Sequence, residues 1–179
     1  MKTFVLFAVL LITCEFAFCS EKVVIETPLG NIVVTLDSDK APKNVTFFLK
    51  HMEERVFQGS SFRSGDGTCI MGGAPGKSAH GYSSSGNMSW KVGAPGEFAL
   101  KNRRGALVMG RTVGGCNPYK TSNSTQFALD FLDDPQDDGE FTVIGYVSEG
   151  MEVVEKIASE LKSKKTTIPI SDVHLLSAK

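Results

Sequence analysis

The sequence lacks the features that mark nucleic-acid or metal-binding proteins. Its 19 lysines and arginines are balanced by 20 aspartates and glutamates, and no basic run occurs. A net charge of −1 gives the surface no attraction for nucleic acid or anionic lipid. Histidine is scarce, with three in the chain, and His51 is expected to lie half-exposed on a helix without a metal partner. We therefore expect neither a nucleic-acid partner nor a metal site.

A long apolar run occurs only at the N-terminus, from Phe4 to Phe18. With its positively charged start and small residues at its end, it predicts that residues 1–20 are a secretory signal peptide. A membrane anchor is disfavoured because the run contains Glu15 and is shorter than the roughly 20 apolar residues of a spanning helix. A lipoprotein signal ending at Cys19 is disfavoured by the aromatic residues before it. Residues 21–179 then form a mature domain that is secreted or held in the secretory-pathway lumen, free of the membrane.

Cysteine is also scarce, and two of the four are expected to leave with the signal peptide. Cys69 and Cys116 remain, in a chain bound for an oxidising compartment. N-glycosylation sequons begin at Asn44, Asn87 and Asn123. This pattern is short and common, and it matters only in a eukaryotic secretory protein.

The remaining composition, with 41% hydrophobic and 22% charged residues, is typical of one globular domain. Alternating or continuous apolar residues predict strands, and apolar residues spaced by three and four predict two helices. The predicted strands are Val23–Ile25, Ile32–Leu36, Ser60–Arg63, Cys69–Met71, Gly105–Met109, Thr125–Leu129, Phe141–Val147 and Val173–Leu176, and the helices begin near Pro42 and Met151. Many strands without regular strand–helix alternation predict a mainly antiparallel sheet.

The acidic stretch from Asp133 to Gly139 is a candidate calcium loop. It lacks the spaced ligands and the terminal glutamate of an EF-hand. We therefore predict an exposed loop and expect no cofactor.

The segments Arg104–Thr112 and Ser124–Phe127 resemble the cyclophilin signature, in which a strand of the type R-G-x-x-x-M-A-R-T leads through a loop to S-Q-F-F. The bacterial and periplasmic type is the most similar pattern, and the resemblance extends from Val23 to about Lys179. It implies a mainly β fold, an eight-stranded antiparallel β-barrel closed by two α-helices, with the ligand site on an outer groove. It also implies peptidyl-prolyl cis–trans isomerase (rotamase) activity on proline-containing segments of client proteins.

The resemblance points to Arg63 as the catalytic arginine. The family run F-H-R-x-x-P-G-F-M-x-Q-G-G is one residue shorter here, between Phe62 and Gly73. Counting back from Gly72, Arg63 falls on the catalytic arginine, which is the alignment we favour. Counting forward from Phe62, it falls on the preceding histidine, and an ordinary surface arginine is the third interpretation.

The resemblance implies that Gln126 binds the substrate backbone. The other substrate-binding positions it implies are Thr68, Cys69, Met71, Gly110, Arg111, Phe127, Phe131, Leu132 and Phe141. Several depart from the family pattern: Thr68 stands where a phenylalanine contacts the proline ring, Met71 replaces the glutamine that steadies the arginine, and Ala128 replaces a second pocket phenylalanine.

We therefore expect a secreted, monomeric isomerase of reduced activity that assists folding. A catalytically weak module that binds proline-containing segments is the alternative, and a structural or signalling domain that uses another face is the third. In the family, the positions of Cys69 and Cys116 both border the groove, so a disulfide between them is one expectation and two separate thiols the other.

Overall fold

A computed structural model describes residues 20–73, 93–114, 117–122, 125–164 and 166–176. The nine strands are β1 (Lys22–Thr27), β2 (Gly30–Leu36), β3 (Ser61–Ser64), β4 (Cys69–Gly73), β5 (Ala106–Met109), β6 (Gln126–Asp130), β7 (Val143–Glu149), β8 (Ile168–Pro169) and β9 (Asp172–Leu175). The helices are α1 (Pro42–Glu53), α2 (Met151–Lys164) and the short 3₁₀ helix η1 (Pro135–Asp137). The predicted mainly antiparallel sheet with two α-helices is confirmed. No helix within the described ranges is long and apolar enough to cross a membrane.

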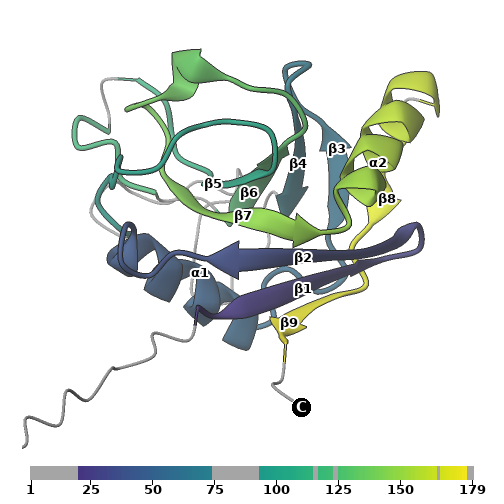
Figure 1. The fold of residues 1–179 in the computed structure, drawn as a ribbon, viewed down its shortest axis with the longest axis horizontal. Helices are drawn as coiled ribbons and strands as arrows, with labels where there is room; N and C mark the ends of the chain where they lie inside the picture. Colours follow the sequence, from purple (N-terminus) through teal and green to yellow (C-terminus); the bar gives the residue numbers. More distant parts are fainter. Residues whose placement is uncertain (1–19, 74–92, 115–116, 123–124, 165, 177–179) are drawn as a thin grey trace, which may run out of the picture.

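The strands form one curled sheet in the order β8-β3-β4-β6-β5-β7-β2-β1-β9. Its two edge strands, β8 and β9, are consecutive in the chain: β8 pairs with β3, and β9 pairs with β1. This C-terminal segment therefore brings the two edges of the sheet together (Figure 1). We predicted eight strands; the structure has nine, because the two-residue strand β8 precedes the predicted closing strand, which is β9.

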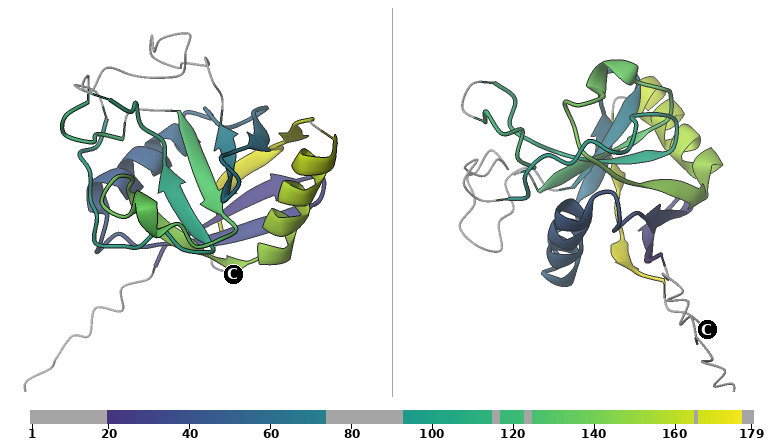
Figure 2. Two further views of the ribbon diagram at one scale, coloured as in Figure 1. Left: turned by 90° about the horizontal axis from the view of Figure 1, so that it is seen from above. Right: turned by 60° about the vertical axis from the view of Figure 1, so that its left-hand side comes forward.

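The two helices lie at opposite ends of the curled sheet, as the two views in Figure 2 show. The predicted apolar face of α1 is confirmed, with Val45, Phe48 and Met52 buried. The expectation for His51 is wrong: its side chain is 2% exposed, and its Nδ1 lies 2.8 Å from the Phe47 carbonyl oxygen. Burial lowers the pKa of His51, because the charged imidazolium loses its hydration there.

The N-terminus of α1 is capped by a distant carboxylate. The Lys43 and Asn44 backbone N–H groups donate to Glu97 at 3.3 and 3.0 Å, which satisfies two groups that a helix leaves open. The Asn44 amide nitrogen donates to the Pro95 carbonyl and to Glu97, both at 2.8 Å, and the residue is fully buried. The asparagine of the first sequon is therefore buried and hydrogen-bonded in the folded chain, and its glycosylation stays a prediction. Asn87 and Asn123 lie outside the described residues.

The core inside the curled sheet is centred on Phe127, which is 1% exposed. Its ring meets those of Phe48, Phe57 and Phe62 edge-on, at centroid distances of 5.2 to 5.9 Å. A side chain at Gly72 would place its Cβ 2.6 Å from the Phe127 ring, so glycine there makes room for the aromatic cluster. Phe127 therefore belongs to the core and does not contact substrate, contrary to the role implied by the family pattern.

We predict that Phe127→Ala lowers the free energy of unfolding by about 3–5 kcal/mol, the usual cost of emptying a core aromatic site. Leu132→Ala, at a side chain that is 51% exposed, is the control and should change it by less than about 0.5 kcal/mol. Denaturant unfolding measures both. Equal effects of the two substitutions would contradict the assignment of Phe127 to the core.

Candidate functional site

Side chains alternate between the two faces of the sheet, and this alternation defines the outer face of β3, β4, β6 and β5. Phe62, Ile70, Phe127 and Leu107 point into the core. Their chain neighbours Arg63, Met71, Ala128 and Val108 point outward and are paired in register across four strands: Arg63 with Met71, Met71 with Ala128, and Ala128 with Val108. We call these four residues the outer row.

Arg63 stands at one end of the outer row and is half-buried. It is paired in register with Met71 of the neighbouring strand β4. Burial lowers the pKa of its guanidinium, which nevertheless remains a cation. Among the described residues, no hydrogen-bond or salt-bridge partner of its side chain is found. Its donors therefore remain available to a ligand on this face.

Arg111, the other arginine near this face, has its donors committed to the protein. Its Nε donates to the Glu140 carbonyl oxygen at 2.7 Å, and Nη2 donates to the Glu140 carboxylate at 2.8 Å. The guanidinium also lies 4.7 Å from the centre of the Phe141 ring. Only 6% of the side chain is exposed. Arg111 therefore acts as a brace beneath the site rather than as a free donor.

A small apolar cluster, which includes Val108 and Ala128 of the outer row, covers the outer face of β5 and β7. Ala106, Val108 and Val143 are buried in it, and the half-buried side chains packed on them include Ala128 and Phe141. Gln126 lies two positions along β6 from Ala128, half-buried and paired with Gly73. Gly110 donates its N–H to the Gln126 carbonyl at 2.9 Å, which places both at the same end of this face. Gln126, Gly110 and Phe141 thus lie on the same face of the sheet as the outer row.

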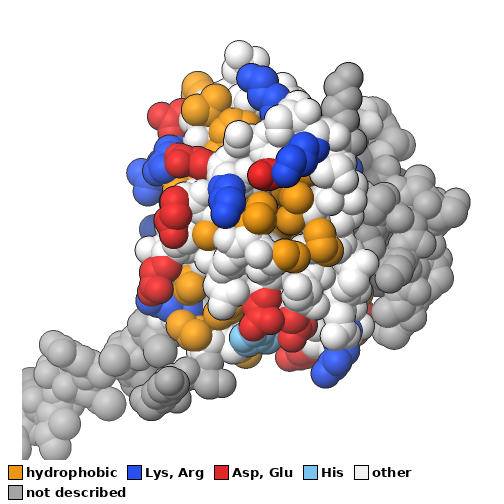
Figure 3. Space-filling view, turned by 90° about the vertical axis from the view of Figure 1, so that its right-hand side faces the viewer, with side chains coloured by type: hydrophobic (Ala, Val, Ile, Leu, Met, Phe, Trp, Pro, Cys, Tyr) orange, Lys and Arg blue, Asp and Glu red, His pale blue; other side chains and the backbone are white. Residues whose placement is uncertain are grey.

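Phe131 and Leu132 do not join this group. Phe131 packs against the inner core and lines a cavity of about 520 Å³ with Ala158 and Leu161 of α2. Leu132 follows it at an exposed position. Hydrophobic side chains gather on the α2 side of the molecule among lysines, arginines and acidic residues (Figure 3). The wall role that the resemblance implies for Phe131 stays a prediction, and the side chain packs between the core and α2.

Thr68 is directed toward acidic residues. Its hydroxyl lies 2.6 Å from a carboxylate oxygen of Asp66 and 2.9 Å from one of Asp134. Its carbonyl oxygen accepts the N–H groups of Phe131 and Leu132. Thr68 therefore ties the β3–β4 turn to the chain after β6 and contributes little apolar surface to the site.

Cys69 and Asp130 are paired on the outer face, one step from the outer row. Burial, followed by the charge of Asp66, raises the pKa of the Cys69 thiol to about 12, so the thiol is unreactive at neutral pH. Cys69 is a free thiol in the structure, and Cys116 lies outside the described residues. Burial is also the main reason that the pKa of Asp130 rises to about 8, with smaller contributions from the charges of Asp134, Asp137 and Asp66.

Comparisons with known proteins point to a single family. The family described as "Cyclophilin type peptidyl-prolyl cis-trans isomerase/CLD" matches residues 22–179. The chain is 32% identical over 177 residues to peptidyl-prolyl cis-trans isomerase A of Dickeya dadantii, covering 91% of this chain and 86% of that protein. It is 27% identical over 157 residues to human peptidyl-prolyl cis-trans isomerase-like 3, covering 86% and 91% of the two chains.

Solved structures show the same fold. A Cryptosporidium parvum cyclophilin type peptidyl-prolyl cis-trans isomerase superposes with a TM-score of 0.73 at 24% identity, covering 89% of this chain and 99% of that one. The same protein in the presence of the dipeptide Ala-Pro superposes with a TM-score of 0.71 over 88% and 99% of the chains.

Proposed function

This chain belongs to the cyclophilin-type peptidyl-prolyl cis-trans isomerases, and we propose that it is a secreted member in which Arg63 carries the catalysis at a reduced rate. The reaction turns an X–Pro peptide bond whose resonance creates a barrier of about 18–20 kcal/mol. No bond to the protein forms, so the site needs a donor for the twisted amide and a surface for the proline ring. Arg63, half-buried with uncommitted donors, is the observation that carries the proposal.

The role of Arg63 follows from the electronic change during rotation. As the bond twists, resonance is lost and the lone pair returns to the prolyl nitrogen, which becomes a hydrogen-bond acceptor. A guanidinium held on the outer face donates to this nitrogen and so stabilises the twisted state more than either planar state. We assign to Gln126, on the same face, the role of holding the backbone of the proline-containing client segment.

We predict that Arg63→Ala lowers kcat/KM for a proline-containing peptide by about 100- to 1,000-fold, the usual effect of losing one preorganised donor. Arg103→Ala is the matched control, because Arg103 is exposed and stacks on Tyr146 outside the outer row. A coupled isomerisation assay measures both, and melting temperatures verify that both variants fold. Wild-type turnover by a folded Arg63→Ala protein would rule out this assignment.

The reduced rate is proposed from what surrounds Arg63. Met71, paired with it, offers no strong hydrogen bond to hold the guanidinium in place. Ala128 is the next side chain in the outer row, and Thr68 is directed toward Asp66 and Asp134, so little apolar surface is left for a proline ring. The same observations favour the second candidate function, a module that binds proline-containing segments with little turnover.

We predict that Ala128→Phe raises kcat/KM several-fold, because a buried aromatic side chain contributes about 1.5–3 kcal/mol of apolar contact. Ala158→Phe on α2, which adds the same ring away from the outer face, should leave the rate unchanged. The same assay distinguishes the two functions. Wild-type turnover already equal to that of a typical family member, with no gain from the added ring, would refute the reduced rate.

Secretion is proposed from the apolar N-terminal run alone. The mature domain would then act as a monomer on client proteins in the secretory pathway or outside the cell. Expression of the full chain in a secreting host, followed by N-terminal sequencing of the product in the medium, tests the cleavage. We predict a new N-terminus near Ser20 or Glu21. Retention of Met1 on a cell-associated product would contradict it.

A further inference from the structure

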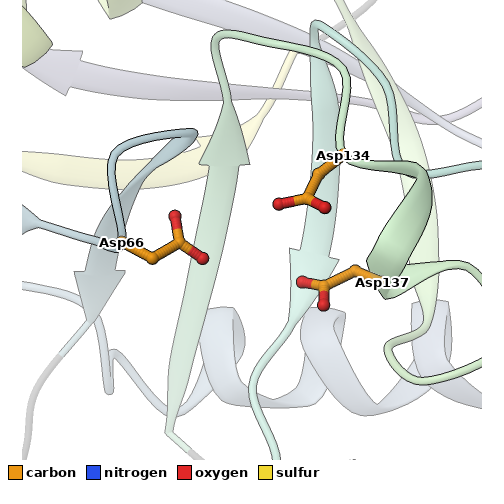
Figure 4. A group of neighbouring side chains, drawn as sticks. All are labelled: Asp66, Asp134 and Asp137. Carbon is orange, nitrogen blue, oxygen red and sulfur yellow. The ribbon is translucent and has the colours of Figure 1, made fainter.

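Three aspartates from two separate loops point toward one another (Figure 4). Asp66 lies in the turn between β3 and β4, whereas Asp134 and Asp137 lie in the loop that follows β6 and contains η1. One carboxylate oxygen from each lies within 4.8 Å of the other two. Calcium binds oxygens at about 2.3–2.6 Å, so two oxygens on one ion can be up to roughly 5 Å apart. The spacing of the three carboxylates therefore permits a single shared calcium ion.

A fourth acidic side chain, that of Asp130, stands at the end of β6. The residue is 5% exposed, and its Oδ2 is buried with no hydrogen-bond partner among the described residues. It is paired with Cys69, whose thiol lies 3.7 Å from Asp66, and the charges of Asp134, Asp137 and Asp66 all act on it. A buried carboxylate with an open oxygen is costly unless a positive partner offsets its charge.

The protein itself supplies no such partner within the described part of the chain. The nearby cations are paired with other carboxylates: Lys101 with Asp138 at 3.1 Å, and Arg111 and Lys120 with Glu140 at 2.8 and 2.6 Å. No lysine or arginine there forms a salt bridge with the four aspartates. The carboxylates of Asp66, Asp134 and Asp137 thus gather without a salt bridge to a described lysine or arginine, although the charge of Arg111 acts on Asp137.

The hydroxyl of Thr68 cannot satisfy both of the carboxylates that it contacts. It lies between Asp66 and Asp134, at 2.6 and 2.9 Å, but it has one hydrogen and can donate to one of them. Asp66 also receives the Thr68 backbone N–H at 3.0 Å. If the hydroxyl hydrogen goes to Asp66, the Thr68 and Asp134 oxygens face each other without a hydrogen between them. A bound cation would remove this repulsion.

We propose that Asp66, Asp134 and Asp137 bind a hard divalent cation, Ca²⁺, next to the buried carboxyl group of Asp130. The ligand set is made of oxygens alone, which suits calcium and disfavours zinc and copper. The ion would link the β3–β4 turn to the loop after β6. Because β3 carries Arg63, it would also hold the turn that follows this strand.

The purified protein, stripped with EDTA, is titrated with CaCl₂ in a calorimeter, and its melting temperature is followed in parallel. We expect one saturable binding event per chain, with a dissociation constant on the order of 10⁻⁴–10⁻³ M, as in extracellular modules. We also expect a melting temperature that rises by several degrees at saturation, since a ligand of the folded state stabilises it. MgCl₂ at the same concentrations should have a smaller effect.

Asp134→Asn is the test variant, because it removes one ligand charge at nearly constant shape. Asp133→Asn is the matched control: Asp133 is an exposed neighbour that accepts the Arg104 N–H, and the change keeps an oxygen acceptor. Calcium binding should weaken at least tenfold in the first variant and stay at the wild-type value in the second. Absence of saturable heat in the wild-type protein, or equal binding by both variants, would overturn the proposal whatever the isomerase activity.

Discussion

The alternation of side chains along β6 is the constraint on which both the core and the site depend. Phe127 and Leu129 point inward, and the aromatic cluster fixes the strand through Phe127. Because the period of a strand is two, Gln126, Ala128 and Asp130 must then point outward. A slip of one residue would turn a glutamine and a carboxylate into the apolar core and expose the central phenylalanine. The packing of the core thus determines which side chains the outer face can present.

The two arginines near this face show how burial assigns roles to chemically identical groups. Arg111 is almost fully buried, donates hydrogen bonds to Glu140 and lies over the Phe141 ring. Arg63 faces outward from β3, half-buried, beside a methionine that cannot accept a strong hydrogen bond. A buried guanidinium needs such partners to offset its desolvation, whereas a half-exposed one is partly solvated until a ligand arrives.

The sequence predicted the elements of the fold well because hydrophobic periodicity and turn residues are local signals. The resemblance also implied that Arg63 and Met71 are neighbours, and the two are paired across the β3–β4 hairpin. The sequence did not show that Phe127 belongs to the core, that Phe131 packs toward α2 or that Asn44 is buried. A linear match gives the order of residues but neither the face of a strand nor the direction of the chain after it. Asn44 is buried by Glu97, which is 53 positions away, and no local pattern reports such a contact.

Thr68 bears on two features of this chain, the small apolar surface proposed for the proline ring and the proximity of Asp66 and Asp134. An aromatic side chain at this position would lie against the proline ring, whereas the threonine hydroxyl lies between Asp66 and Asp134. The exchange removes apolar surface from the site and at the same time joins two acidic loops that would otherwise repel each other. The acidic stretch after β6 supplies only two of the three neighbouring carboxylates, because the third, that of Asp66, comes from the β3–β4 turn (Figure 4). The proposed loss of a proline-ring contact and the proximity of the aspartates therefore both involve Thr68.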